Sequence, residues 1–494
     1  MKSLTLTCII AIALFLALAM PVQLVAQHPR YRFIDLGTLG GPSSFTYGGT
    51  AQSLNSRGTV IGQSDTSIPD PNYPNFNPFI SGPDPFLQHG FRWRNGVREE
   101  LGTLTGATLG GADWVNQEGV AVGVSTNGAI DPLTGWPESQ AVLWRGDGQV
   151  VDLGNSLGYE SGAAALNDQG LVVGGATNKT PDSFSFLELL FGPVPNATQL
   201  RAVLWQKGVM QDLGTLGGPD AFAIAVNERG QIIGTSYTNA TANPTTTIPT
   251  VDPFLWENGK MTDLGSLGGT FGGPNWLNNR GQVVGSSNLA GDSTFHPFLW
   301  DRGILTDLGT FGGDNGQAFW INDGGDVAGE ADFAGNQIHH AFLWKHGVLN
   351  DLGTVGSDPC SNALHINSKG QVVGTSTNCG GVTLHVFLWE NGGPMIDLGT
   401  FVPPGFNLSL TEPTFINERG EITINGVLPN GDEHAFMLIP CGEGEASCID
   451  AAATPANARA TTSPQSASRR SVLTGSHARW KQRFPLLSIT SRTD

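Results

Sequence analysis

Basic residues are scarce in this sequence. It holds 25 Lys and Arg against 43 Asp and Glu, which gives a formal net charge of −18. Binding to nucleic acid depends on Lys and Arg side chains that neutralise phosphates, so this balance argues against a nucleic-acid partner. The excess of acid is typical of a soluble, solvated surface.

Motifs that signal catalysis are also missing from the sequence. It contains no GxSxG, no P-loop, no Rossmann glycine pattern and no HExxH. Without a CxxC pair, structural zinc is not expected either. We therefore expect no cofactor and no metal, and a protein that is not an enzyme.

Long apolar runs are confined to the N-terminus. Residues 1–26 combine Lys2, an apolar stretch over Leu4–Met20 and a small residue at Ala26. This pattern predicts a signal peptide that is removed on export. We expect a secreted, extracellular or periplasmic protein with no stable membrane insertion.

Cysteines are few, and their number fits export. Of five, Cys8 lies in the expected signal peptide, which leaves four for an oxidising compartment. Four cysteines allow three pairings. We favour one disulfide that flanks the first two strands of a repeat and one short clip after the last strand, namely Cys360–Cys379 and Cys441–Cys448.

Most of the chain consists of one repeated unit, seen in its compact form at Asp307–Trp344. Three landmarks recur in fixed order, namely DLG, Asn-x-x-Gly and HxFLW or a close variant, and they define eight copies. The compact copies repeat every 44 residues, which is typical of a repeat architecture. Glu100 heads the second copy, and the others begin at Asp35, Asp152, Asp212, Asp263, Asp307, Asp351 and Asp397.

Each copy offers four short strands bounded by Gly, Asn and Asp, which is the content of one β-propeller blade. The chain opens with a fourth-strand type at 31–37, and the last copy, ending with a third-strand type at 434–439, lacks one. Pairing these two segments would close a ring without an open edge. We predict an all-β fold, an eight-bladed propeller over residues 27–440, with a linear β-solenoid as the alternative. Residues 441–494 should form the cysteine clip and a disordered basic tail.

The repeats resemble the HAF-repeat family of extracellular bacterial proteins. The matching motifs are DLGTLGG at 212–218, INxxGQVVG at 366–374 and HAFLW at 340–344. The resemblance covers about residues 30–440. It implies a secreted repeat protein, and the family has no settled biochemical activity.

Four insertions interrupt the regular repeats, at 64–88, 125–140, 177–201 and 236–252. All lie between the second and third strands of copies one to four, so they should emerge on one face of the ring. Loops on a rigid scaffold often carry binding sites. Exposed aromatic residues can stack on sugars or anchor a protein, and the alternative is that they fold back into a small core. The candidate ligand-binding residues are Tyr73, Phe76, Phe79, Trp136, Phe184 and Phe186.

The repeated Asp of DLG is predicted to be structural. It occurs in nearly every copy, whereas a catalytic pair should differ from the repeat. We expect it to accept backbone N–H groups of a turn, or to contact the His that opens several third strands (His89, His296, His340, His385 and His434). Trp114, Trp276 and Trp320 instead precede the turn Asn by two residues, and they face either the central channel or a blade interface.

The leading functional hypothesis is a secreted, non-enzymatic binding scaffold. Its ligand would be a glycan or an extracellular protein at the face that carries the insertions, and we expect a monomer. One alternative is a polysaccharide lyase or hydrolase with carboxylates at the channel mouth, its candidates being Asp84, Asp131, Glu138 and Glu188. The other alternative is a structural envelope protein.

Overall fold

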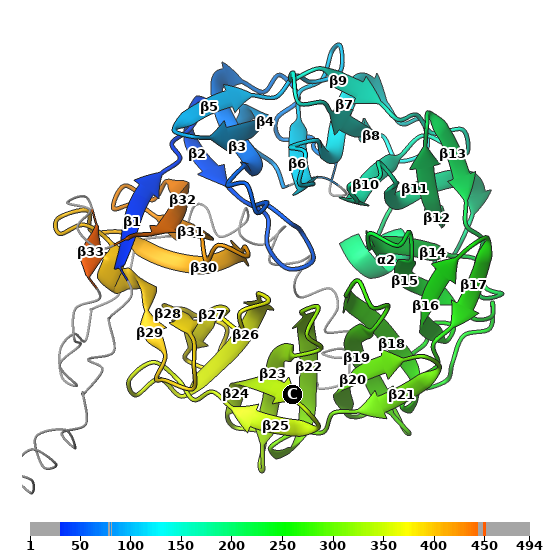
Figure 1. Cartoon of the computed structure of the whole chain (residues 1–494). Helices are drawn as coiled ribbons and strands as arrows, with labels where there is room; N and C mark the ends of the chain where they lie inside the picture. Colours follow the sequence, from blue (N-terminus) through cyan, green and yellow to red (C-terminus); the bar gives the residue numbers. More distant parts are fainter. Residues whose placement is uncertain (1–29, 78–79, 81, 443–447, 451–494) are drawn as a thin grey trace, which may run out of the picture.

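The computed structural model describes residues 30–77, 80, 82–442 and 448–450. Its strands form antiparallel sheets that stand around an axis in a ring (Figure 1). The fold is a β-propeller, as predicted. The expected signal peptide at 1–26, the candidate residue Phe79 and the expected tail beyond residue 450 lie outside the described residues.

Each unit of the ring is a meander of four antiparallel strands, counted from the axis outward. The first unit comprises β2 (Gly40–Phe45), β3 (Val60–Pro69), β4 (Phe86–Arg94) and β5 (Val97–Glu100). The second comprises β6 (Gly110–Val115), β7 (Ala121–Ile130), β8 (Pro137–Trp144) and β9 (Val150–Asp152). The third comprises β10 (Ser161–Leu166), β11 (Val172–Pro181), β12 (Thr198–Gln206) and β13 (Val209–Asp212).

The next four units continue the same pattern. The fourth comprises β14 (Ala221–Val226), β15 (Ile232–Tyr237), β16 (Val251–Glu257) and β17 (Lys260–Asp263). The fifth comprises β18 (Gly268–Leu277), β19 (Val283–Leu289), β20 (Phe295–Asp301) and β21 (Ile304–Asp307). The sixth comprises β22 (Gly312–Ile321), β23 (Val327–Phe333), β24 (His339–Lys345) and β25 (Val348–Asp351), and the seventh β26 (Cys360–Ile366), β27 (Val372–Thr377), β28 (Thr383–Trp389) and β29 (Ile396–Asp397). Single parallel pairings join β16 to β18 and β20 to β22 into one sheet, so the count of eight separate blades stays a prediction.

The last unit takes its fourth strand from the start of the described chain. It comprises β30 (Ser409–Ile416), β31 (Ile422–Val427), β32 (Glu433–Pro440) and β1 (Arg30–Asp35). Phe33 pairs with Leu438 and Asp35 with Phe436, which confirms the predicted closure. A further short strand, β33 (Ile449–Asp450), pairs with the outer edge of β1 and was not expected. Two short helical segments, α2 (Phe186–Phe191) and η1 (Leu398–Phe401), lie outside the repeated pattern.

The glycine of the VVG-type second strands is required by close packing. A Cβ at Gly329 would lie 2.0 Å from the carbonyl oxygen of Gln317 and 2.5 Å from the ring of Phe342. At Gly374 a Cβ would meet the carbonyl of Asn362 at 1.9 Å. The fully buried Phe of the HxFLW motif therefore lies over this glycine, and the two landmarks form one packing unit.

Both predicted disulfides are present. Cys360, at the start of β26, is bonded to Cys379 with a Cα–Cα distance of 5.2 Å. Cys441 is bonded to Cys448, 6.3 Å away between Cα atoms, just before β33. The second bond thus holds the chain beyond β32 next to the strand that closes the ring.

The ring has two different faces because the strands of each unit alternate in direction. One face carries the Asn-x-x-Gly turns between first and second strands, and we name it the turn face. The other carries the connections between second and third strands, where all four insertions lie, and we name it the insert face. The insertions lie between β3 and β4, β7 and β8, β11 and β12, and β15 and β16.

Candidate functional site

A closed circle of hydrogen bonds runs around the axis at the turn face. In every copy the Asn of the Asn-x-x-Gly turn donates its side-chain N–H to the backbone carbonyl of the corresponding Asn in the next copy. The last bond, from Asn417 to the carbonyl of Asn55 at 2.9 Å, closes the circle. The others start from Asn55, Asn116, Asn167, Asn227, Asn278, Asn322 and Asn367, with donor–acceptor distances of 2.8–3.4 Å.

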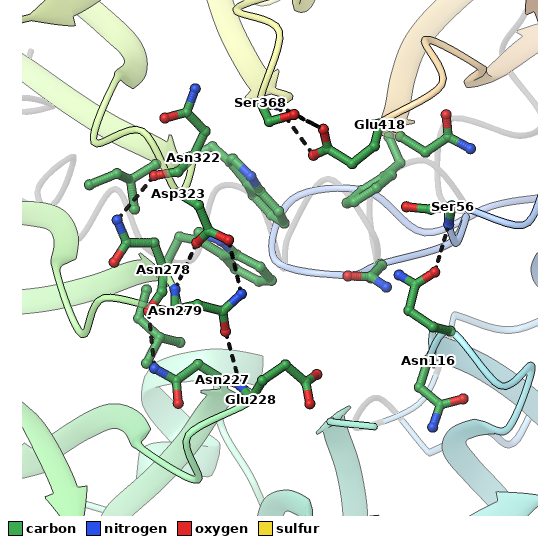
Figure 2. A pocket seen from close by; sticks show the side chains of 18 of the residues that line it. Ser56, Asn116, Asn227, Glu228, Asn278, Asn279, Asn322, Asp323, Ser368 and Glu418 are labelled. Atoms are coloured by element: carbon green, nitrogen blue, oxygen red, sulfur yellow. Dashed lines mark hydrogen bonds between the residues drawn. The ribbon is translucent and has the colours of Figure 1, made fainter. Parts of the chain in front are cut away.

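The residue after each Asn forms a second circle, which we name the rim. Its members are Ser56, Gln117, Asp168, Glu228, Asn279, Asp323, Ser368 and Glu418. In six of the eight steps a rim backbone N–H donates to the side chain of the next rim residue, and we name these bonds the clasp. Figure 2 shows the rim bonds of Asn279 with Asp323 and of Ser368 with Glu418.

The clasp has two gaps, which coincide with the two serines. The next rim residue is Ser368 for the N–H of Asp323, and Ser56 for the N–H of Glu418. Within the described residues neither N–H has a protein acceptor. A serine side chain is shorter than the amides and carboxylates used elsewhere, so the rim leaves two backbone donors available.

Inside the rim lies a cavity of about 610 Å³, which we name the cup. Its wall is made by apolar residues from the first strands, such as Leu166, Ile321 and Ile366, and its mouth by the rim. A volume of this size is typical of small-molecule sites, which range over roughly 300–1,000 Å³. The cup is therefore large enough for a ligand on the axis of the ring.

A stack of tryptophans forms the base of the cup. The ring of Trp276 lies 3.5 Å from that of Trp320 and 5.3 Å from that of Trp114, between ring centres. These residues come from the second, fifth and sixth copies, so the stack crosses the axis. The three tryptophans thus face the channel, one of the two placements that the sequence left open.

Another segment fills part of the channel beside the stack. Copy one carries extra residues after β2, and this loop reaches into the middle of the ring (Figure 1). The side chain of Gln52 donates to the carbonyl of Val115, and the Nε2 of His365 lies 3.1 Å from the carbonyl of Gly49. This loop was not predicted from the sequence. It lies between the first and second strands, whereas the four predicted insertions lie between the second and third strands.

On the turn face, acidic residues lie on the rim and basic residues lie farther from the axis. Four rim residues are acidic, and none of the described residues lining the cup is Lys or Arg. The basic residues of the same turns lie one position outward, where Arg57 pairs with Glu118 and Arg419 with Glu421. Burial raises the pKa of Glu228 above its usual value. The mouth of the cup is thus rich in hydrogen-bond acceptors.

The third insertion does not present its aromatic residues to solvent, which corrects one predicted site residue. Phe186 is only 2% exposed, its ring centre lies 4.4 Å from that of Tyr237, and its N–H donates to Asp220. Ser185 caps α2 by accepting from Leu187. Phe184, Phe186, Leu187 and Leu189 have folded into a small core, because exposed apolar side chains are costly in water.

The other predicted aromatic residues differ in exposure. Trp136 and Phe184 are half-buried and pack against the same core, and Phe76 is also half-buried. The insertions also bond to one another, since Asn77 donates to the carbonyl of Pro137. Only Tyr73 of the described candidates is largely exposed, at 53%. The aromatic candidates of the second and third insertions are thus packed against a core, and Tyr73 in the first insertion is exposed.

The acidic residues proposed for an enzyme lie away from the cup. Asp131 accepts from the N–H of Leu133 and from Thr134, and Glu138 accepts from Asn127 and Gln140. Asp84 accepts from Phe86, and Glu188 is exposed on α2. None of the four lines the cup. The carboxylates at the channel mouth are instead those of the rim, at the opposite face.

The repeated Asp makes the expected turn contact in all seven copies that have it, and the expected His contact in three of them. Each accepts the N–H of the Gly two residues later, at 2.7–2.8 Å, in Asp35, Asp152, Asp212, Asp263, Asp307, Asp351 and Asp397. The expected His contact occurs for His296, His340 and His434, and His89 contacts Glu100. His385 contacts Asp358 instead.

No group of three or more metal-ligating side chains occurs among the described residues. In the same part of the chain, no helix has the length and apolar content needed to cross a membrane.

Neither a family model nor a curated protein matches this chain. Solved structures similar to it include an acylaminoacyl peptidase from Pyrococcus horikoshii, with 10% identity and a TM-score of 0.39 over 78% of this chain and 58% of the peptidase. Another is the β-propeller domain of the Trilobed protease from Pyrococcus furiosus, with 10% identity and a TM-score of 0.40 over 72% of this chain and 96% of that domain. A gluconolactonase from Xanthomonas campestris shares 13% identity, with a TM-score of 0.28 over 66% of this chain and 83% of that one. The chain thus spans less than two thirds of the peptidase, and these likenesses concern the fold alone.

Proposed function

We propose that this chain is an exported, non-enzymatic binding protein of the HAF-repeat type whose ligand enters the cup. The observation that carries the proposal is the cup itself, a cavity on the axis with a polar mouth built from all eight copies. The two disulfides support an oxidising compartment. This moves the expected site from the insert face to the turn face.

The rim carries more charge than its structural role requires. Gln117 and Asn279 accept the clasp bond with neutral amide oxygens, at 3.0 Å in both cases. Asp168 and Asp323 accept the same bond with carboxylates. Since amides suffice in two copies, holding the ring together does not explain the acidic residues. Recognition of a ligand explains why these rim positions are acidic.

Binding accounts for the rim better than catalysis. Asp323 accepts from both the N–H and the side chain of Asn279, and Glu418 accepts from Ser368. Carboxylates that such bonds hold in place are positioned to accept hydrogen bonds from a ligand. The raised pKa of Glu228 is the one feature that favours acid catalysis, and it keeps the hydrolase alternative in the test.

The test is a glycan and peptide array probed with three forms of the protein. Ser56→Trp fills the cup at a rim position whose side chain accepts no clasp bond, and Tyr73→Ala removes the exposed aromatic residue of the insert face. We expect Ser56→Trp to abolish binding and Tyr73→Ala to retain it, with circular dichroism showing both variants folded. The reverse pattern would return the site to the insert face. Cleavage products from any bound glycan would establish an enzyme instead.

A further inference from the structure

The base of the cup presents hydrogen-bond donors as well as aromatic rings. Trp114 and Trp320 are 4% and 6% exposed, and both line the cup. Within the described residues neither indole N–H has a protein acceptor, whereas the indoles of Trp144 and Trp205 donate to carbonyls of Gly102 and Gly154. Neither indole nitrogen is a buried unpaired atom, so both N–H groups are accessible from the cup that these residues line, where a ligand can accept a hydrogen bond from them.

The cup therefore combines acceptors at its mouth with donors at its base and at the clasp gaps. The acceptors are the carboxylates and amides of the rim. The donors are the indole N–H groups and the backbone N–H groups of Asp323 and Glu418. A hydroxyl group both donates and accepts, so a molecule bearing several hydroxyls can satisfy both sets at once. An ammonium or guanidinium group has donors only and would leave the indole N–H groups unpaired.

The closed base limits how much of a long ligand can enter. The tryptophan stack crosses the axis, and the loop that carries Gly49 and Gln52 fills the channel beside it, bonded to Val115 and His365. A polymer chain cannot thread through this ring. Only the end of a chain can occupy the cup.

Resting on the proposed function, we propose that the cup binds the terminal residue of a neutral carbohydrate chain. The rim carboxylates accept hydrogen bonds from its hydroxyls, and the indoles of Trp114 and Trp320 donate to its oxygens. The acidic mouth disfavours uronic or other acidic sugars, because like charges at short range repel. Trp276, which is half-buried, is the most accessible aromatic surface for the apolar face of the sugar.

The experiment is calorimetric titration of the purified protein with cellohexaose, xylohexaose, chitohexaose and maltoheptaose. Hexagalacturonate serves as the acidic comparison and hexa-arginine as the basic one. We expect at least one neutral oligosaccharide to bind and hexagalacturonate not to bind. Binding of the neutral ligand should persist between roughly 50 mM and 500 mM NaCl, whereas attraction between charges would be screened.

Variants of the rim and the base connect this binding to the cup. The double variant Asp323→Asn/Glu418→Gln keeps clasp acceptors of the kind found at Asn279 and Gln117 but removes two charged acceptors. It should weaken binding about tenfold or more, since bonds to charged groups are the stronger ones. Trp320→Phe keeps an aromatic ring and removes one donor, and it should also weaken binding. Asp147→Asn, at an exposed turn on the same face, is the matched control and should bind like the wild type.

The outcomes separate this inference from the proposed function. If hexa-arginine binds and no neutral oligosaccharide does, and Ser56→Trp abolishes that binding, the cup is a binding site but the carbohydrate inference is wrong. If a neutral oligosaccharide binds equally well to the wild type, the double variant and Trp320→Phe, the inference is also wrong. If cyclic β-cyclodextrin, which has no chain end, binds as tightly as maltoheptaose, recognition of a terminal residue is overturned.

Discussion

At the scale of single residues, the turn Asn performs two tasks. Its side-chain oxygen accepts backbone N–H bonds within its own turn, and its side-chain N–H bonds to the next copy. In the third copy, Asn167 accepts from Gln169 and Leu171 and donates to Asn227. The turn could be predicted from the local Asn-x-x-Gly pattern. The bond between copies could not, because its partner lies 60 residues away along the chain.

We predict that Asn167→Ala lowers the free energy of unfolding by roughly 2–4 kcal/mol. The substitution leaves two part-buried backbone N–H groups without partners and removes one of the two bonds to the carbonyl of Asn227, and an unpaired buried group costs about 1–3 kcal/mol before relaxation. Chemical unfolding in urea measures the change. Asn155→Ala, which also removes side-chain hydrogen bonds but lies outside the circle, is the comparison. Equal effects of the two substitutions would contradict a special role for the circle.

A second prediction at this scale concerns Glu160, which is buried beneath the insertions. Burial raises its pKa to about 8, although hydrogen bonds from Ser139 and Asn77 oppose the shift. The folded chain therefore keeps a proton on Glu160 over a pH range in which the unfolded chain, with a pKa near 4.5, has released it. This stabilising contribution is complete below pH 4.5 and is lost as the pH rises through about 8.

Glu160→Gln should therefore reduce the loss of stability between about pH 5 and about pH 9, by at least about 1 kcal/mol. Glutamine retains an oxygen for the same donors but does not titrate. Urea unfolding at the two pH values measures the difference for both forms. A variant that loses as much stability as the wild type would show that Glu160 does not titrate in this range.

At the scale of elements, the closing strand was predictable and the packing of the insertions was not. β1 could be assigned because the last copy lacks a fourth strand and the start of the chain has the sequence of one. Whether an aromatic loop lies open or packs on its neighbours depends on tertiary contacts such as that of Phe186 with Tyr237. The alternating direction of the strands predicts which face carries the insertions. Composition alone could not show that their apolar side chains are buried.

The closing strand gives a prediction about chain order. In a chain that begins at Thr38, residues 31–37 can be placed after Pro440 through an Asn-Gly turn, which makes β1 an ordinary fourth strand. This permutant should keep a cooperative thermal transition. Deleting residues 31–37 should cost several kcal/mol, because it exposes the edge of β32 and removes the buried side chains of Tyr31 and Leu36.

Thermal unfolding followed by circular dichroism compares the two chains. A permutant as unstable as the deletion would contradict closure by pairing alone, and it would indicate that the segment from Cys441 to β33 is essential to the ring.

At the scale of the whole molecule, the ring creates a site that no single repeat contains. The rim residues are ordinary turn residues in each copy, and they become a mouth only when the copies are brought together around an axis. Three residues of the site, Trp114, Trp276 and Trp320, could be predicted from the sequence as channel candidates, because they depart from the repeat. It missed the rim because those positions vary between copies and no local pattern marks them.

The central claim is that a ligand occupies the cup, and a crystal structure with a bound oligosaccharide tests it most directly. The crystals would be grown with the neutral oligosaccharide that binds most tightly in calorimetry. We predict a terminal sugar within hydrogen-bond distance of Asp323 or Glu418 and of the indole N–H of Trp320. A sugar bound at the insert face near Tyr73, with the cup holding only water, would contradict the account.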